Sequence, residues 1–109
     1  MTPEDPVAEL GGLAEASVEI LVVLSGGAAH GYAIKTAVER ETGRTLGPGT
    51  LYAALARLEE RGLIEPLPSD DRRQPYRLTG RGSQVLAAEL TRLQALANRG
   101  LERLGRTPE

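Results

Sequence analysis

Apolar residues recur at helical spacing in four stretches of the chain, and two short apolar runs separate the third stretch from the fourth. Spacings of three and four residues predict amphipathic helices. The two short runs flank a polar, turn-forming segment, which predicts an antiparallel hairpin. The expected helices cover residues 13–25, 30–43, 48–61 and 80–104, and the expected strands cover residues 63–67 and 75–79.

The third of these helices has the clearest boundaries. Pro48 suits the first helical position, where no backbone N–H is needed, and Gly62 suits the residue just past the end. Thr50, Tyr52 and Arg57 lie outside the apolar stripe, where a core helix gains nothing from them. This distribution is typical of a DNA-recognition helix, whose N-terminal residues contact base edges and phosphates. The stripe that would face the core is Leu51, Ala54, Leu55 and Leu58.

The order of the elements indicates a mainly α winged helix-turn-helix fold. Three helices with a short turn before the third give the helix-turn-helix, and the hairpin that follows gives a two-stranded wing. Pro66 cannot donate a backbone hydrogen bond, so the first wing strand should be short or paired on one side only. We expect a flexible N-terminal segment at 1–12, the winged domain at 13–79, and a C-terminal dimerisation helix with its tail at 80–109.

The first and last helices carry more apolar residues than a three-helix core needs. In the last helix they follow the alternating spacing of a coiled-coil seam, which needs a partner helix. Left exposed, these surfaces would exceed the apolar patch that soluble monomers usually carry. They predict a homodimer in which each last helix packs against its mate and the partner's first helix. The expected interface residues are Leu13, Ile20, Leu24, Leu86, Leu90, Leu93, Ala97 and Leu104.

Composition narrows the possible classes of function. The chain has 109 residues, no Cys and one His, so it forms one domain without disulfides and cannot build a Cys- or His-based metal site alone. We expect no metal, no other cofactor and no catalytic activity, because no nucleophile or paired-carboxylate motif stands out. No apolar run approaches the length of a membrane span. We therefore expect a cytoplasmic protein with no membrane partner.

The net charge of −2 argues against nucleic acid at first sight, but the charges are unevenly distributed. Residues 1–27 hold five acids and no base, whereas residues 28–81 hold nine bases and seven acids. Twelve of the 13 bases are Arg, which favours bidentate contacts to phosphate or guanine. The charge pattern permits DNA binding over the middle of the chain.

Four motifs occur in register along nearly the whole chain, from about residue 13 to 104. They are Gly31-Tyr32-Ala-Ile34, Pro48-Gly-Thr-Leu-Tyr52, Leu55-x-x-Leu58-Glu-x-x-Gly62-Leu-Ile64 and Tyr76-Arg-Leu-Thr79-x-x-Gly82. With them the sequence resembles the short form of the PadR-like family of bacterial transcriptional regulators. The resemblance implies a homodimeric repressor that binds a pseudo-palindromic operator in double-stranded DNA. It also implies release from the operator when a small-molecule effector at the dimer interface changes the geometry of the two DNA-binding heads.

The expected DNA contacts come from the second helix, the third helix and the wing. For Tyr52, the resemblance implies a hydroxyl that reaches a DNA phosphate, and the alternative is an aromatic cap on the core. Arg57 is as well suited to an ion pair with a neighbouring Glu, and Lys35 to simple solvation. Wing arginines suit the minor groove, but the adjacent Asp70 and Asp71 would partly neutralise them. The full set is Lys35, Gly49, Thr50, Tyr52, Arg57, Arg72, Arg73 and Gln74.

Three further features bear on this interpretation. Gly47 stands where the family commonly has a Ser helix cap, a change that costs only tenths of a kcal/mol. His30 is expected to have a structural role at the start of the second helix. The chain has no Trp and no Phe, which argues against an effector held between aromatic rings.

The alternative function is a winged-helix module that binds another protein, without sequence-specific DNA binding.

Overall fold

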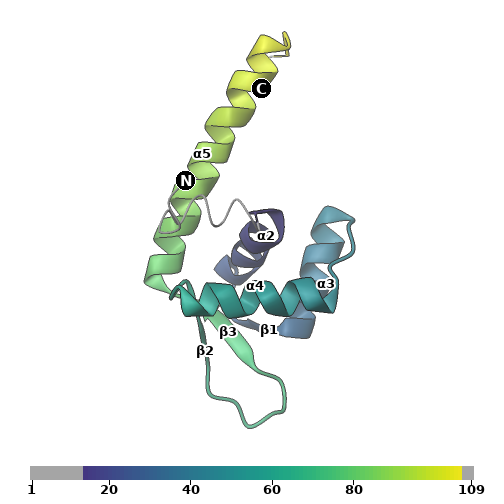
Figure 1. Cartoon of the computed structure of the whole chain (residues 1–109), viewed down its shortest axis with the longest axis vertical. Helices are drawn as coiled ribbons and strands as arrows, with labels where there is room; N and C mark the ends of the chain where they lie inside the picture. Colours follow the sequence, from purple (N-terminus) through teal and green to yellow (C-terminus); the bar gives the residue numbers. More distant parts are fainter. Residues whose placement is uncertain (1–13, 107–109) are drawn as a thin grey trace.

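A computed structural model describes residues 14–106 of the chain, and the expected N-terminal segment 1–12 lies outside this range. Figure 1 shows the helices that precede the wing gathered over a small sheet, with the last helix and the wing loop extending in opposite directions. This arrangement confirms the predicted mainly α winged helix-turn-helix. The elements are α2 (Ala14–Ser25), β1 (Ala29–His30), α3 (Gly31–Thr42), α4 (Pro48–Glu60), β2 (Ile64–Pro66), β3 (Pro75–Leu78) and α5 (Gly80–Arg103).

Helix α2 is the centre of the head, the name used here for residues 14–79. It packs against α3, α4, β3 and α5, and Ile20 and Leu21 have no exposed surface. Both apolar faces of α2 are therefore covered by its own chain. Ile20 and Leu24, which were expected to face a second copy, are covered by their own chain, and Leu13 lies outside the described residues. The other core side chains are Val18, Ile34, Val38, Leu46, Leu51, Ala54, Leu55, Leu58, Leu63, Ile64 and Leu86.

The sheet has three strands, where the sequence predicted a two-stranded wing. Strand β3 is the middle strand, antiparallel to β1 on one side and to β2 on the other. Tyr76 in β3 lies opposite both Ala29 of β1 and Pro66 of β2. Strand β2 pairs on one side only, as the missing N–H of Pro66 predicted. Strand β1 has two residues, too few to show an alternating pattern in the sequence.

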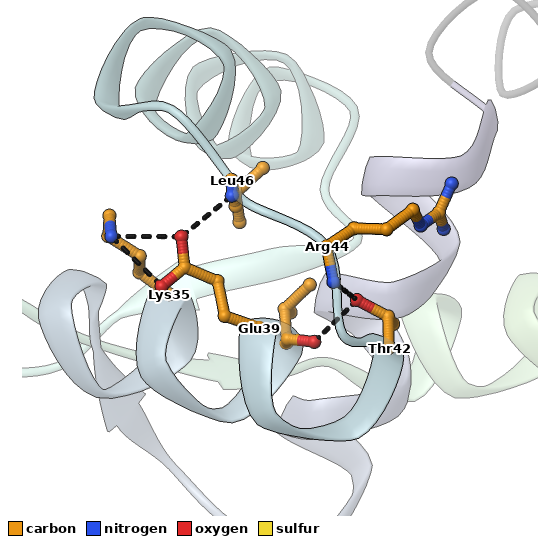
Figure 2. Close-up of polar contacts among 6 residues, drawn as sticks. Lys35, Glu39, Thr42, Arg44 and Leu46 are labelled. Carbon is orange, nitrogen blue, oxygen red and sulfur yellow. Dashed lines mark hydrogen bonds and ion pairs between the residues drawn. The ribbon is translucent and has the colours of Figure 1, made fainter.

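A single carboxylate ties the start of α4 to α3. Glu39 accepts hydrogen bonds from the backbone N–H of Leu46 at 2.7 Å and from Nζ of Lys35 at 2.9 and 3.1 Å (Figure 2). These contacts hold the pKa of the Glu39 carboxyl below its usual value, and the hydrogen bond from Leu46 contributes more than that from Lys35. Gly43, with a φ of 73°, ends α3 in the left-handed conformation that glycine adopts most easily. The hydrogen bond to Leu46 and the conformation of Gly43 thus hold the turn between α3 and α4 in place.

Arg44 ties the same turn to α2. Its guanidinium group pairs with the Glu15 carboxylate at 2.6 Å and with the Glu19 carboxylate at 3.3 Å. The hydrogen bond and charge of Arg44 lower the pKa of Glu15. The acidic residues near the start of the described chain therefore neutralise a base of the turn.

The joint between the head and α5 depends on a close approach at Gly82. A Cβ atom on Gly82 would lie 2.0 Å from the carbonyl oxygen of Leu63, a distance that no side chain could tolerate. Thr79 caps α5, because its hydroxyl accepts from the Gly82 N–H at 2.9 Å and donates to the Gly62 carbonyl at 2.6 Å. The first turn of α5 is therefore fastened to the segment that follows α4.

Beyond its first turns, α5 leaves the head and forms an arm, defined here as residues 90–103 (Figure 1). Leu86, the first residue of the seam, is buried, with 5% of its surface exposed. The seam residues after it are only partly covered or exposed. Leu86 was expected in a dimer interface, but its side chain is covered by its own head. Leu90 and Leu104 are 40% and 72% exposed. No helix among residues 14–106 is long and apolar enough to cross a membrane.

Candidate nucleic-acid interface

Helix α4 separates its residues into a buried face and an exposed polar face. The predicted stripe from Leu51 to Leu58 is buried, whereas Gly49, Thr50 and Arg57 are exposed. Gly47 makes no side-chain cap, as the sequence led us to expect. The first N–H groups of a helix have no intrahelical partners and attract anions. The start of α4 therefore combines open backbone donors with an exposed hydroxyl.

Tyr52 projects from α4 over the beginning of α3. Its side chain is 56% exposed, so it is not a core cap. One side of the ring rests against Gly31, where a Cβ atom would lie 3.0 Å from the Tyr52 hydroxyl oxygen. Burial raises the pKa of the neighbouring Tyr76, and the charges of Glu59 and Tyr52 add to this rise. Tyr52 is thus bounded by α3 and faces the wing side of the head.

A recess of about 270 Å³ lies between the start of α3, Tyr52 and the wing. It brings together Tyr52 with Arg72, Arg73 and Gln74, which are separated from it by about twenty residues of sequence. His30 and Tyr32 complete its lining. Two phenols, two guanidinium groups and a helix N-terminus form a surface suited to a phosphate group.

The wing residues have different roles within this recess. Arg72 and Arg73 are exposed, and their guanidinium groups form no ion pair with any residue from 14 to 106. The side-chain nitrogen of Gln74 donates to the carbonyls of Leu67 and Pro75, both at 2.9 Å. Gln74 therefore uses both of its N–H donors to close the wing, which disfavours its expected role as a donor to DNA.

Some basic side chains of the head are paired with acids, and others are available to DNA. Lys35 is held by Glu39 and Arg77 pairs with Glu65, so the expected DNA contact of Lys35 would require breaking its ion pair. The guanidinium group of Arg57 pairs with no acid in the described part of the chain. Residues 14–106 contain no group of three His, Asp or Glu side chains that could hold a metal ion.

Tyr32 was not among the predicted site residues, whereas His30 lies at the start of α3 as predicted. The Nδ1 atom of His30 accepts the Ala33 N–H at 3.3 Å and caps α3, which confirms the expected structural role. Tyr32 is 68% exposed and lines the recess. It stood in a motif beside Gly31, but its position relative to the wing depends on the fold, so only the motif itself could have drawn attention to it.

A second surface lies where the arm leaves the head. A cavity of about 330 Å³ between α2, α3 and α5 has an apolar lining and two acids, and its residues include Val18, Glu19, Val22, Val38, Glu41 and Leu90. Val22 is 38% exposed and was not predicted as part of an interface. Leu90 lines this cavity and also belongs to the seam of the arm. Leu93 is half-buried, and Ala97 and Leu104 are exposed.

Comparison with known proteins shows which family this sequence matches. The model of the transcriptional regulator PadR-like family matches residues 20–88. The matched span includes α3, α4, the wing and the first turns of α5, and therefore both the recess and the head–arm joint.

Individual relatives agree with this match. An uncharacterized 37.1 kDa protein in transposon TN4556 of Streptomyces fradiae is 42% identical over 88 residues, which are 81% of this chain and 26% of that protein. The chain thus spans about a quarter of the length of that curated relative. The solved structure of H. salinarum RosR is 32% identical and has a TM-score of 0.67 over 74% of each chain. A PadR family transcription regulator from hypervirulent Clostridium difficile is 26% identical, with a TM-score of 0.71 over 82% of this chain and 96% of that one.

Proposed function

This chain belongs to the PadR-like family of transcriptional regulators, and we propose that it binds a pseudo-palindromic operator as a homodimeric, effector-responsive repressor. The observation that carries the proposal is the recess in which Tyr32 and Tyr52 meet Arg72 and Arg73. These groups come from three elements on one side of the head. Their common property is the ability to bind the negatively charged DNA backbone.

Helix α4 is the element proposed to enter the major groove. The groove is wide enough for one helix, and the exposed face of α4 supplies the polar groups that contact its floor and edges. Thr50 and the N–H groups near Gly49 would contact phosphate at the start of α4, and Arg57 a base or a more distant phosphate. Tyr52 would contribute its hydroxyl to a backbone phosphate.

The wing is proposed to supply attraction that does not depend on sequence. Arg72 and Arg73 have open guanidinium groups, whereas several other bases of the head are already paired with acids. Asp70 and Asp71 lie in the same exposed loop. They reduce the net charge of the wing but do not occupy either guanidinium group.

A homodimer would place two heads on the operator. One helix-turn-helix reads only a few base pairs, so specific regulators combine two half-sites about 34 Å apart. The seam residues Leu90, Leu93 and Ala97 of the arm, with Leu104 just past its end, support pairing with a second copy. The cavity beside Val22 and Leu90 extends that apolar surface onto the head.

The same cavity is the proposed effector site. Its volume of about 330 Å³ lies at the lower end of the range for small-molecule pockets. It joins α2 and α3 of the head to the arm, so a bound molecule would change the angle between them. A changed angle would alter the spacing of the two heads and release the operator.

A salt titration with a short duplex tests the proposal. The double variant Arg72→Ala/Arg73→Ala is expected to bind specific and random duplexes more weakly. Its slope of log affinity against log salt should become shallower by roughly one for each phosphate that the variant no longer neutralises. The matched control is Arg99→Ala/Arg106→Ala, which removes two exposed arginines far along the chain from the recess and should retain the wild-type slope.

Two outcomes would contradict the proposal in different ways. An unchanged slope in the wing variant would remove the wing from the interface. A wild-type protein without salt-dependent affinity for any duplex would favour the alternative, a winged-helix module that binds another protein.

A further inference from the structure

Gly31 is a glycine that its own backbone does not require. It is the first residue of α3, follows the cap His30 and is buried. Among the described residues, the glycines with positive φ are Gly27, Gly43, Gly62 and Gly105, so Gly31 has an ordinary conformation. Alanine is the better helix former and would also restrict the unfolded chain. What distinguishes Gly31 from Gly80, the equally placed first residue of α5, is a close contact at the position that a Cβ atom would occupy.

That contact is with the side chain of Tyr52. A Cβ atom on Gly31 would lie 3.0 Å from the Tyr52 hydroxyl oxygen, 3.2 Å from its Cε1 atom and 3.3 Å from its Cζ atom. All three atoms belong to the far end of the phenol ring. Real carbon atoms rarely approach so closely, so a methyl group on residue 31 would push this end of the ring away from α3 by a few tenths of an ångström.

We propose that Gly31 is a positioning residue for DNA binding: it gives the Tyr52 ring a seat against α3 that holds the hydroxyl in place for a backbone phosphate. This inference rests on the proposed function. The hydroxyl lies beside the first turn of α3, where the helix dipole favours an anion. Arg72 and Arg73 line the same recess and would contact the same stretch of backbone.

An exposed tyrosine needs such a seat. More than half of the Tyr52 surface is open to solvent, and exposed side chains change rotamer on the picosecond to nanosecond scale. Contact with Gly31 on one side limits this motion, which reduces the ordering that binding would otherwise require. The hydrogen bond to a phosphate also depends on distance and angle, so a small displacement of the hydroxyl weakens it.

A double-mutant cycle tests the inference with the full-length protein and a short fluorescent duplex of mixed sequence. The four proteins are wild type, Gly31→Ala, Tyr52→Phe and the double variant. Gly31→Ala is expected to weaken binding about tenfold, the effect of losing one hydrogen bond to a charged group. In the Tyr52→Phe background the same change should cost no further affinity, because the hydroxyl is already absent.

The cycle separates positioning from packing. Phenylalanine retains the ring atoms that meet residue 31, so a packing defect would weaken binding equally in both backgrounds, and that result would overturn the inference. The control is Gly80→Ala, which alters the first residue of α5, where a Cβ atom would meet nothing within 4 Å. It should leave the affinity unchanged and the melting temperature equal to or slightly above that of the wild type, because alanine is the better helix former.

Failure of this inference can be told apart from failure of the proposed function. If the wild type binds the duplex and Gly31→Ala binds as well, the inference fails while the proposed function stands. If the wild type binds no DNA, the proposed function itself fails. If Gly31→Ala unfolds the chain, Gly31→Ala/Tyr52→Ala should fold again, because the ring no longer occupies the space. Continued unfolding of that pair would show that Gly31 serves something other than Tyr52.

Discussion

Helices α2 and α5 both carry apolar residues on more than one side, but α2 buries nearly all of them within its own chain, with Val22 as the exception. Ile20, Leu21 and Leu24 of α2 are at most 3% exposed. On α5, Leu86 is buried, whereas Leu90 and Leu96 are 40% and 48% exposed. The same helical periodicity therefore marks a core element in one case and an open surface in the other.

The difference follows from length and surroundings. Helix α2 has 12 residues and packs against two helices, a strand and the base of α5. Helix α5 has 24 residues, or about 36 Å at 1.5 Å per residue. The structure measures 53 × 33 × 23 Å, and its long axis follows α5 beyond the head (Figure 1). A helix that extends beyond its head has apolar residues that no other part of residues 14–106 covers.

The largest expected effect comes from breaking the joint between the two regions. Gly82→Ala should destabilise the protein by about 3 kcal/mol or more, because the new methyl group meets a backbone carbonyl that cannot rotate away. Thermal unfolding followed by circular dichroism should show a melting temperature lower by more than about 10 °C. Gly80→Ala, two residues earlier, is the matched control, and equal melting temperatures for the two variants would contradict the close packing at Gly82.

The second prediction separates the arm from the head. Leu90→Asp/Leu93→Asp should give a monomer in sedimentation and reduce operator affinity more than about a hundredfold, since one head alone reads too few base pairs. The head should remain folded, because its core residues are untouched. Gln94→Asp, an exposed change outside the seam, should leave the dimer intact. A wild-type protein that sediments as a monomer at micromolar concentration would refute both the dimer and the mechanism built on it.

The smallest effect concerns the acid sensitivity of the head. The pKa values of Glu15 and Glu39 lie below the usual 4.5, so their contacts with Arg44, Lys35 and Leu46 stabilise the folded state above that pH. This stabilisation is lost as the pH falls through the lowered values. The melting temperature should therefore fall between about pH 5 and pH 3. Glu39→Gln should show a weaker dependence on pH over this range, and an identical profile would contradict the role of the Glu39 charge.

Local chemistry made much of the fold predictable. Pro48 and Gly62 bracket α4, and Thr79 caps α5, because these residues act through their own backbone or near neighbours. The leucine stripe of α4 is buried as its spacing indicated. The hairpin also follows from a polar turn between two apolar runs, and its second strand, β3, lies within one residue of the predicted bounds.

The candidate site was predicted as separate residues but not as an arrangement. Tyr52 and Arg57 are exposed as expected, while Lys35 and Gln74 are engaged by Glu39 and by wing carbonyls. Those partners lie four residues from Lys35, and seven residues and one residue from Gln74, but whether a side chain turns to them or to solvent depends on the surrounding packing. Tyr32 entered the site only because α3 begins beside the wing.

By itself the sequence determined where helices begin and end, which face of α4 is apolar, and that α5 carries a seam. These properties depend on residues within a few positions of one another. Only the tertiary structure decided that β1 joins the sheet, that α2 buries both apolar faces within its own head, and that Gly31 lies beneath Tyr52. Each of these depends on contacts between segments distant in the chain, and the energy of such contacts depends on how the whole head packs.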